Sequence, residues 1–222
     1  MKIDILTLFP NMFDGFINES IIKRAIDKKL VEINIHNIRD YSQYNNKKVD
    51  DYSYGGGAGM VLMCDPIFRA IEALKKEDTL VIMLTPSGKT FTQNTAKSLS
   101  KEKHIILLCG HYEGFDERIK TIVDLELSIG EYVLTGGEIA AMAITDATTR
   151  LIDGVINKES LDNESFNDNL VDYPVYTYPR EYRGLKVPEV LLSGHHANIE
   201  KYRNDERIRL TNIRSERDHG QN

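Results

Sequence analysis

The sequence predicts an α/β fold with a mostly parallel sheet, followed by a small helical unit. Short apolar runs alternate with helix-like segments along the first two thirds of the chain, the pattern of strands joined by crossover helices. Two of these runs end in glycine-bearing turns, and such turns at strand ends form the ligand site of an open α/β sheet. Because 222 residues allow one such domain and a smaller unit, we divide the chain into an α/β domain at 1–156, a flexible linker at 157–173 and a helical domain at 174–222.

The composition is that of an ordinary soluble globular protein, with 41% hydrophobic and 28% charged residues. No apolar run approaches the roughly 18 residues that would span a bilayer, and Met1 begins directly on a strand pattern. We therefore expect a cytoplasmic protein without membrane contacts. The net charge of −6 argues against a protein that coats nucleic acid with its whole surface, although it allows a local basic face. Cys64 and Cys109 lie in apolar surroundings without metal-ligand spacing, so we expect them to be core residues and predict no metal site.

The chain opens with a strand, a helix and a second strand. Lys2–Leu8 alternates apolar residues and is closed by Phe9-Pro10. Ser20 is placed to cap a helix whose apolar stripe reaches Leu30, and the alternation resumes at 31–35. This order is the start of an α/β fold.

Residues 37–60 have no clear period and end in Y-G-G-G-A-G-M. A loop of this length inside a compact domain is usually functional or disordered. Its glycines allow two interpretations, a flexible hinge or a backbone surface that closely approaches a partner or substrate. The sequence leaves both open.

A helix is predicted to begin at Asp65-Pro66, with the apolar strand Thr79–Leu84 after it. The sequence T-P-S-G-K-T that follows suggests a phosphate-binding loop, but that motif requires a glycine at position 83, which is Met. We therefore reject a phosphate-binding loop.

The next elements complete the predicted sheet. Thr92 is expected to cap a helix that reaches Leu99, and His104–Cys109 is another buried strand. Residues 116–123 are expected to form a short helix and residues 124–129 a strand. At least five strands that alternate with helices predict a parallel sheet covered on both faces.

The segment S-I-G-E-Y-V-L-T-G-G-E at 128–138 joins the last of these strands to a helix. Gly130, Gly136 and Gly137 permit tight turns, positive φ and the close approach of a flat ligand. The helix expected at 138–152 points its unpaired N–H groups at this loop. It is apolar on nearly all sides, so we expect it to be buried in the core or against a second subunit.

The charge changes in the C-terminal third. Residues 157–173 contain five acidic residues and one Lys, which is typical of a mobile linker or lid. Residues 178–217 contain nine Lys or Arg and six Asp or Glu, and two short helices at about 194–202 and 205–214 would display them. A basic helical unit on an acidic domain suggests a clamp for a polyanion, and an ordinary solvated helical face is the alternative.

Apolar glycine turns suit a cofactor that has a purine and no phosphates to neutralise. The first strand-to-helix turn, Phe9-Pro10, has no G-x-G-x-x-G and no acidic partner for a ribose at the usual distance. S-adenosylmethionine therefore fits better than a dinucleotide.

Five motifs, in order over nearly the whole chain, closely resemble the bacterial tRNA (guanine-N1)-methyltransferases, TrmD-type enzymes of the SPOUT class that modify position 37 of tRNA. Any one motif alone would be weak, but five in this order are highly specific. The motifs are Y-G-G-G-A-G-M at 54–60, L-T-P-S-G at 84–88, C-G-H-Y-E-G-F-D-E-R at 109–118, S-I-G-E-Y-V-L-T-G-G-E at 128–138 and V-P-E-V-L-L-S-G-H-H at 187–196.

The resemblance implies a SPOUT-type fold with a deep trefoil knot around residues 84–138 and a homodimer whose active site is shared between subunits. It implies that the C-terminal unit grips the tRNA, with the anticodon stem-loop as its partner, and that S-adenosylmethionine lies bent in the knot. The residues that would contact the cofactor are Leu84, Thr85, Pro86, Gly110, Tyr112, Glu113, Gly114, Ile129, Gly130, Glu131, Tyr132, Val133, Leu134, Gly136 and Gly137.

The implied reaction needs a base and a cation. Guanine N1 carries a proton at neutral pH, so a carboxylate suits its removal and a guanidinium suits the negative charge that develops on O6. By resemblance, Arg150 in D-A-T-T-R-L-I matches the active-site arginine of the family, and Glu164 in E-S-F matches the general base in its D-S-F motif. Asp172 also matches an acidic position of the family.

Three residues depart from the family pattern. Glu164 replaces an Asp, so a neighbouring carboxylate could act as the base instead, the candidates being Asp162, Asp168 and Asp172. Tyr178 stands where the family has Arg, which puts one tRNA contact in doubt, and Ser53 stands where it has Pro. The resemblance suggests that Mg²⁺ assists, but no carboxylate cluster in the sequence identifies its site.

Two other functions stay open. One is an RNA-binding or assembly module that has kept the fold and lost turnover, which the Asp-to-Glu change allows. The other is a knotted methyltransferase with another target, such as a ribose 2′-hydroxyl, whose chemistry does not need the acidic base in the linker.

Overall fold

The protein has two compact units, Met1–Asn157 and Lys158–Asn222, in a computed structural model that describes residues 1–157, 165–166 and 170–219. The division into domain, linker and second domain stays a prediction, because most of residues 157–173 lie outside the described part.

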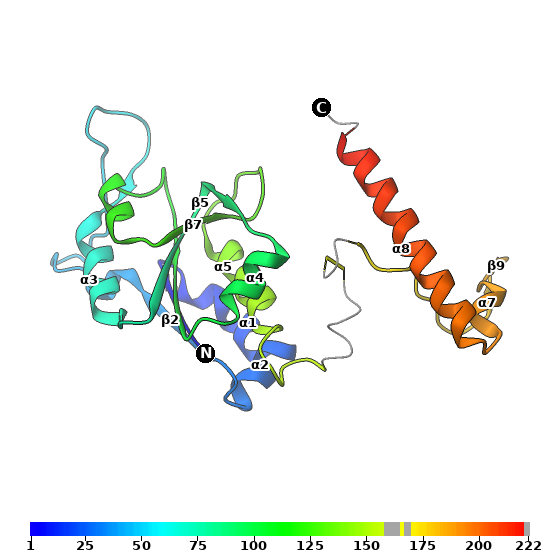
Figure 1. Cartoon of the computed structure of the whole chain (residues 1–222). Coiled ribbons are helices and arrows are strands. Elements are labelled where there is room, and N and C mark those ends of the chain that lie inside the picture. Colours follow the sequence, from blue (N-terminus) through cyan, green and yellow to red (C-terminus); the bar gives the residue numbers. More distant parts are fainter. Residues whose placement is uncertain (158–164, 167–169, 220–222) are drawn as a thin grey trace. The chain divides into compact units, whose positions relative to one another are not determined.

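The first unit is built on a parallel sheet of five strands in the order β2-β1-β6-β5-β7 (Figure 1). The prediction of a mostly parallel α/β sheet is therefore confirmed. All six residues of the strand in third place are buried, as expected for a parallel strand covered on both faces. The strands are β1 (Lys2–Thr7), β2 (Glu32–Asn37), β5 (Thr79–Thr90), β6 (His104–Cys109) and β7 (Leu125–Ser128).

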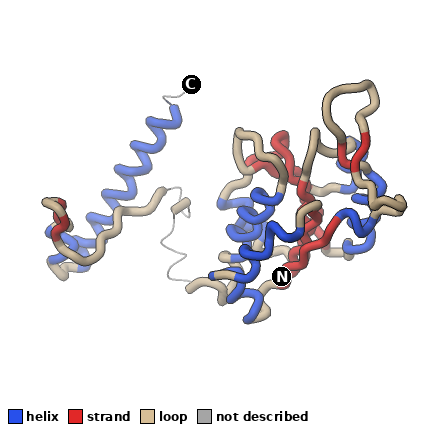
Figure 2. Tube along the Cα trace, turned by 180° about the vertical axis from the view of Figure 1, so that it is seen from behind, coloured by secondary structure: helices blue, strands red, loops and turns tan. Residues whose placement is uncertain are grey.

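Helices cover both faces of this sheet (Figures 1 and 2). Side chains alternate along the strands, so that Ile3 and Ile5 of β1 enter one hydrophobic cluster and Leu6 enters the other. One face is covered by α3 (Cys64–Leu74). The other face is covered by α1 (Asp14–Asn18), α2 (Ser20–Asp27), α4 (Gln93–Leu99) and α5 (Glu138–Thr149).

Short elements fill the connections of the first unit. The segment 37–60 contains one of three 3-10 helices and the first strand of an antiparallel pair. The third 3-10 helix occupies the place of the short helix expected at 116–123. These elements are η1 (Pro10–Phe13), η2 (Ile38–Tyr41), η3 (Glu117–Ile122), β3 (Asp50–Asp51) and β4 (Val61–Leu62).

Several predicted boundaries were wrong. Ser20 is not a cap but the first residue of α2. The cap position is Glu19, the one residue between α1 and α2, and its side chain makes no capping hydrogen bond. Helix α3 begins at Cys64, so Pro66 lies in the first turn, where its missing N–H costs little, and Asp65 bonds Arg69 instead of capping. Strand β5 continues past Leu84 and pairs with β7 again after a register shift. Helix α5 ends at Thr149 rather than at residue 152.

The second unit contains β8 (Glu181–Tyr182), β9 (Leu185–Lys186), α7 (Glu189–Leu192) and α8 (His196–His219). The two helices expected at about 194–202 and 205–214 are one continuous helix, so the predicted break between them was wrong. No Pro or Gly interrupts α8, and the ion pair of Glu206 with Arg209 supports the turn that follows Asp205.

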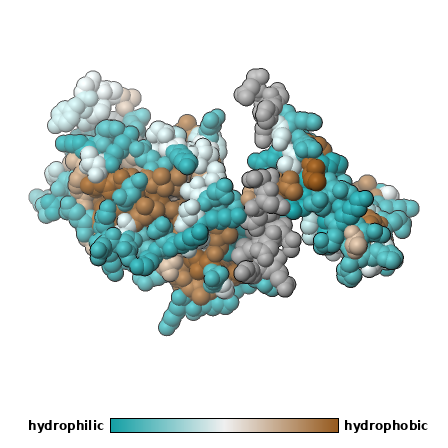
Figure 3. Space-filling model, in the orientation of Figure 1, coloured by the Kyte–Doolittle hydropathy of each residue, from teal (hydrophilic) through white to brown (hydrophobic). Residues whose placement is uncertain are grey.

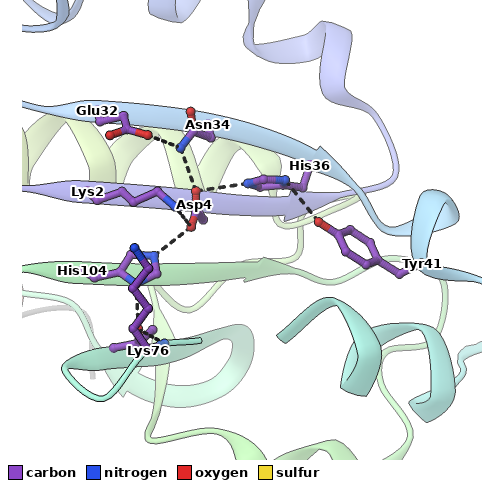
Figure 4. Close-up of polar contacts among 9 residues, drawn as sticks. Lys2, Asp4, Glu32, Asn34, His36, Tyr41, Lys76 and His104 are labelled. Carbon is purple, nitrogen blue, oxygen red and sulfur yellow. Dashed lines mark hydrogen bonds and ion pairs between the residues drawn. The ribbon is translucent and has the colours of Figure 1, made fainter. Parts of the chain in front are cut away.

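A buried carboxylate lies within the sheet, on β1 between β2 and β6 (Figure 4). Asp4 of β1 is fully buried and accepts from Lys2 at 2.8 Å, Asn34 at 2.9 Å, His36 at 3.1 Å and His104 at 2.7 Å. Burial raises the pKa of Asp4, but these hydrogen bonds outweigh it and hold the pKa well below its usual range. We call these five residues the Asp4 cluster; nothing in the sequence pattern predicted it.

Candidate active site

A cavity of about 200 Å³ lies beside the middle of β5 and the carboxyl ends of β6 and β7. Its walls come from residues 84–86 within β5, from the segments 110–115 and 127–137 at the ends of β6 and β7, and from Ala140 of α5. This is the edge at which an open α/β sheet binds its ligand.

Every predicted cofactor-binding residue except Glu131 lines this cavity. Glu131 is exposed and is not among the lining residues. Further residues of the lining were not among the predicted cofactor contacts, although all of them except Ala140 of α5 lie in or next to the predicted segments. The additional residues are His111, Phe115, Leu127, Ser128, Thr135 and Ala140.

The glycines of the turn before α5 line the cavity, and Gly137 also has a packing role that the sequence analysis did not predict. Gly130 has φ +153°, but Gly136 and Gly137 do not have positive φ. A Cβ on Gly137 would lie 2.8 Å from both Cys109 Cα and the backbone nitrogen of Gly110, and the Gly137 N–H donates to the Gly110 carbonyl at 2.9 Å. Because glycine has no Cβ, the turn that contains Gly137 can pack with its backbone directly against the backbone of the turn that contains Gly110.

A second buried carboxylate, Glu138, adjoins the cavity. Glu138 is the first residue of α5 and is 2% exposed. Its Oε1 accepts from the Thr7 hydroxyl at 2.6 Å, and its Oε2 lies 3.1 Å from His111 Nε2. We call Thr7, Glu138 and His111 the Glu138 chain. The sequence analysis placed Glu138 only as a helix start and missed its partners, since they are distant in the sequence.

Cys109 lies next to this chain and is fully buried, as the sequence predicted. Burial raises the pKa of its thiol, and the Glu138 carboxylate raises it further. A thiol held in its neutral form is a poor nucleophile. Cys109 therefore contributes packing.

The Y-G-G-G-A-G-M segment is attached to the cavity turn at 110–115. The Glu113 N–H donates to the Met60 carbonyl at 3.0 Å, and the Leu62 N–H donates to the Gly114 carbonyl at 2.9 Å. Gly59 has φ +79°, and an added Cβ there would collide with the Glu113 side chain. Tyr54, at the start of the segment, is fully exposed. These contacts favour the interpretation of a surface beside a ligand over that of an unattached hinge.

The predicted catalytic residues belong to different units or lie outside the described residues. Arg150 follows the last residue of α5, about 18 Å along the helix from Glu138, and does not line the cavity. Asp172 belongs to the second unit, where it is exposed and its backbone N–H donates to the Ser165 hydroxyl at 2.9 Å. Glu164 lies outside the described residues, as do Asp162 and Asp168.

The rejected phosphate-binding sequence T-P-S-G-K-T forms the end of β5, which is a strand and not a phosphate-cradling loop. Within the described residues, no group of three His, Cys, Asp or Glu could hold a metal ion. In the same part of the chain, no helix is both long enough and apolar enough to cross a membrane.

The second unit presents aromatic and arginine side chains together. Its residues line a groove of about 430 Å³ that includes Tyr173, Tyr178 and Arg203. The Arg203 guanidinium lies 4.9 Å from the centre of the Tyr173 ring. Tyr178, which replaces the arginine of the family pattern, is 90% exposed. Aromatic rings can stack on bases and cations can bind phosphates, so this groove has the types of side chain that RNA-binding proteins use.

A protein-family model described as "tRNA (Guanine-1)-methyltransferase TrmD" matches residues 1–218. The chain is also similar to proteins that carry the name tRNA (guanine-N(1)-)-methyltransferase. One from Dictyoglomus turgidum is 53% identical over 212 residues, 95% of this chain and 86% of that protein. One from Malacoplasma penetrans is 56% identical over 213 residues, 96% of this chain and 94% of that protein.

Proposed function

The chain belongs to the tRNA (guanine-1)-methyltransferase TrmD family and is a tRNA methyltransferase, and we propose that it transfers a methyl group from S-adenosylmethionine to N1 of guanosine 37, next to the anticodon. The observation that carries the proposal is the cavity beside β5 and the carboxyl ends of β6 and β7. It is lined by residues from three of the family motifs, those at 84–88, 109–118 and 128–138. A tRNA substrate further predicts a cytoplasmic enzyme.

The cavity suits S-adenosylmethionine. Leu84, Ile129 and Leu134 supply apolar walls for a purine, and the glycine turns supply backbone groups for its polar edges. Among the described residues that line the cavity there is no Lys or Arg, whereas Glu113 supplies one carboxylate. This lining matches a donor that bears a positive sulfur and no phosphate. When bound, S-adenosylmethionine supplies an electrophilic methyl group.

The catalytic work falls to residues outside the cavity wall. Glu164 takes the proton from guanine N1, which leaves the nitrogen lone pair available, and the Arg150 guanidinium stabilises the negative charge on O6. Asp172 is the second candidate for the base. Mg²⁺ assists the reaction in this proposal, without an assigned site.

A homodimer would bring these residues to the cavity. Since Arg150 lies about 18 Å along α5 from Glu138, an arginine of a second copy is better placed to serve the site. Exposed apolar side chains support this arrangement: Phe9 is 44%, Ile139 is 50% and Val133 is 89% exposed. Figure 3 shows apolar surface among hydrophilic side chains on the viewed face of the first unit.

Two further parts of the proposal come from the family. We assign a deep trefoil knot to residues 84–138, and the backbone contact of Gly137 with Gly110, between the two turns of that segment, supports it. We assign the anticodon stem-loop to the second unit, and its exposed tyrosines and stacked arginines support that assignment.

Methyl transfer to tRNA transcripts tests the reaction. We expect N1-methylguanosine at position 37 and no product when that guanosine is replaced by adenosine, because adenine N1 has no proton to remove. Glu164→Gln should lower the single-turnover rate by roughly 100-fold or more, while donor affinity stays near that of the wild type. Binding of tRNA without methyl transfer would favour the module without turnover, and a methyl group on a ribose oxygen would favour the other target. If Glu164→Gln kept the full rate and Asp172→Asn did not, the base would be Asp172.

Mixing two inactive variants tests the shared site. An Arg150→Ala protein mixed with a Glu164→Gln protein should regain part of the activity, because one composite site of the mixed dimer has both residues. A monomer in sedimentation at micromolar concentration that is still active would contradict the dimer.

A further inference from the structure

The Glu138 chain connects three strand-end segments that are distant in the sequence. Thr7 is the last residue of β1, His111 follows β6, and Glu138 begins the helix that follows β7. The Thr7 hydroxyl accepts a hydrogen bond from the Phe9 N–H at 2.9 Å and donates its own proton to Glu138. One carboxylate thus links the end of β1 to two of the turns that line the cavity.

His111 is held by packing as well as by the carboxylate. Its ring lies 4.7 Å from the ring of Phe9, centre to centre, and is tilted by 52°. Gly136 is packed so closely against His111 Nε2 and Glu138 Oε2 that an added Cβ would overlap both. The position of the imidazole is therefore set from two sides.

The next residue, Tyr112, has φ +59°, which is unfavourable for a side chain with a Cβ. A strained backbone persists only where its surroundings hold it, and such residues concentrate at ligand sites. Tyr112 and His111 both line the cavity. The residue before Tyr112, His111, is hydrogen-bonded to the buried Glu138 carboxylate. Hydrogen bonds to carboxylates are stronger than those between neutral groups, so this bond can hold the strained backbone of Tyr112 in place.

We propose that Glu138 is a positioning residue that, through Thr7 and His111, holds the turn at 110–115 in the shape that binds the methyl donor. The Glu138 chain of three residues determines the affinity for the donor, and it does not affect the rate of methyl transfer at saturating donor. The inference rests on the proposed function, because it takes the cavity to be the donor site.

Thr7→Val is the first test, since valine keeps the shape of threonine and removes only the hydroxyl. We expect the KM for S-adenosylmethionine, and its Kd by calorimetry, to rise about tenfold, the loss of one hydrogen bond to a charged group. The kcat at saturating donor and the KM for tRNA should stay within about twofold of the wild type. Thr7→Ser should restore the donor KM. His111→Phe, which keeps a ring beside Phe9, should raise the donor KM in the same way.

Thr79→Val is the matched control. Thr79 is also a buried strand threonine, and its hydroxyl lies 2.6 Å from His104 in contact with the Asp4 cluster, away from the cavity lining. We expect this variant to lower Tm but leave the donor KM within about twofold. Equal changes of donor KM in the two valine variants, or an unchanged donor KM in both Thr7→Val and His111→Phe, would overturn the proposal. Calorimetry keeps this outcome distinct from a failure of the proposed function, in which the wild type would bind the donor and methylate no tRNA.

Discussion

Asp4 and Glu138 are both buried carboxylates on the same sheet, but they are held in different ways. Asp4 lies within β1 and accepts from four side chains on three adjacent strands. Glu138 lies at the carboxyl edge of the sheet and has two partners, one at a strand end and one in a turn that lines the cavity.

This difference suggests that the Asp4 cluster contributes to folding stability, whereas the Glu138 chain contributes to ligand binding. A buried charge costs several kcal/mol unless it is paired and hydrogen-bonded, and the Asp4 cluster meets that cost with groups that rigid strands hold in register. The Glu138 chain has fewer hydrogen bonds, and they hold turns of the cavity wall instead of strands. In our proposal the shape of these turns determines how well the donor binds. We therefore expect changes at Asp4 to alter folding stability and changes around Glu138 to alter donor affinity.

The largest effect is expected for Asp4→Asn. The amide cannot pair with the Lys2 ammonium, and removing one partner of a buried charge network costs about 3 kcal/mol of the free energy of unfolding. Urea unfolding measures this loss, and calorimetry well below Tm should show an unchanged Kd for S-adenosylmethionine. A donor Kd raised about tenfold in a protein of normal stability would break the comparison.

The same variant has a pH signature. The pKa of Asp4 in the folded protein lies well below the value of about 3.9 in an unfolded chain. Its stabilisation is therefore fully present above about pH 4 and is lost as the pH falls further, by up to about 1.4 kcal/mol per pH unit. The difference in unfolding free energy between the wild type and Asp4→Asn should thus be smaller at pH 3 than at pH 7. A difference that grew on acidification would have the wrong sign.

A smaller effect on stability is expected for Gly137→Ala. The new Cβ would meet the backbone of Cys109 and Gly110, which cannot rotate away, so we expect a loss of about 1–3 kcal/mol. Because the two cavity turns must also separate, the Kd for S-adenosylmethionine should rise at least about tenfold. Gly15→Ala is the control, since an added Cβ there has no neighbour within 4 Å and should change stability by less than about 1 kcal/mol. Normal donor binding by Gly137→Ala would show that the turns tolerate displacement.

The smallest effect is expected for Thr145→Val in α5. The Thr145 hydroxyl is buried and has no hydrogen-bond partner among the described residues, in contrast to those of Thr7 and Thr79. Valine removes an unsatisfied polar group, so the free energy of unfolding should rise by up to about 1 kcal/mol. Thr79→Val should change it in the opposite direction. A destabilised Thr145→Val protein would indicate that this hydroxyl has a hydrogen-bond partner, which the proposed dimer could supply.

Local patterns in the sequence predicted most of the fold and the outline of the site. The buried strands were recognisable as apolar runs, Thr92 was correctly placed as a cap, and the glycine turns pointed to the residues that line the cavity. These features depend on neighbours within a few residues, which a sequence displays directly. Errors appeared at the boundaries of elements, as where the two helices expected at about 194–202 and 205–214 form one continuous helix.

Only the tertiary structure decided which distant residues meet. Asp4 lies 100 residues from His104, and Thr7 lies 131 residues from Glu138, so their hydrogen bonds exist only because parallel strands align in one register. Gly137 looked like a contact for a ligand, and the packing of its turn on Gly110 shows that the protein itself requires it. Side-chain types and spacing are written in the sequence, but the pairing of buried polar groups across strands depends on sheet order and register, which no local pattern determines.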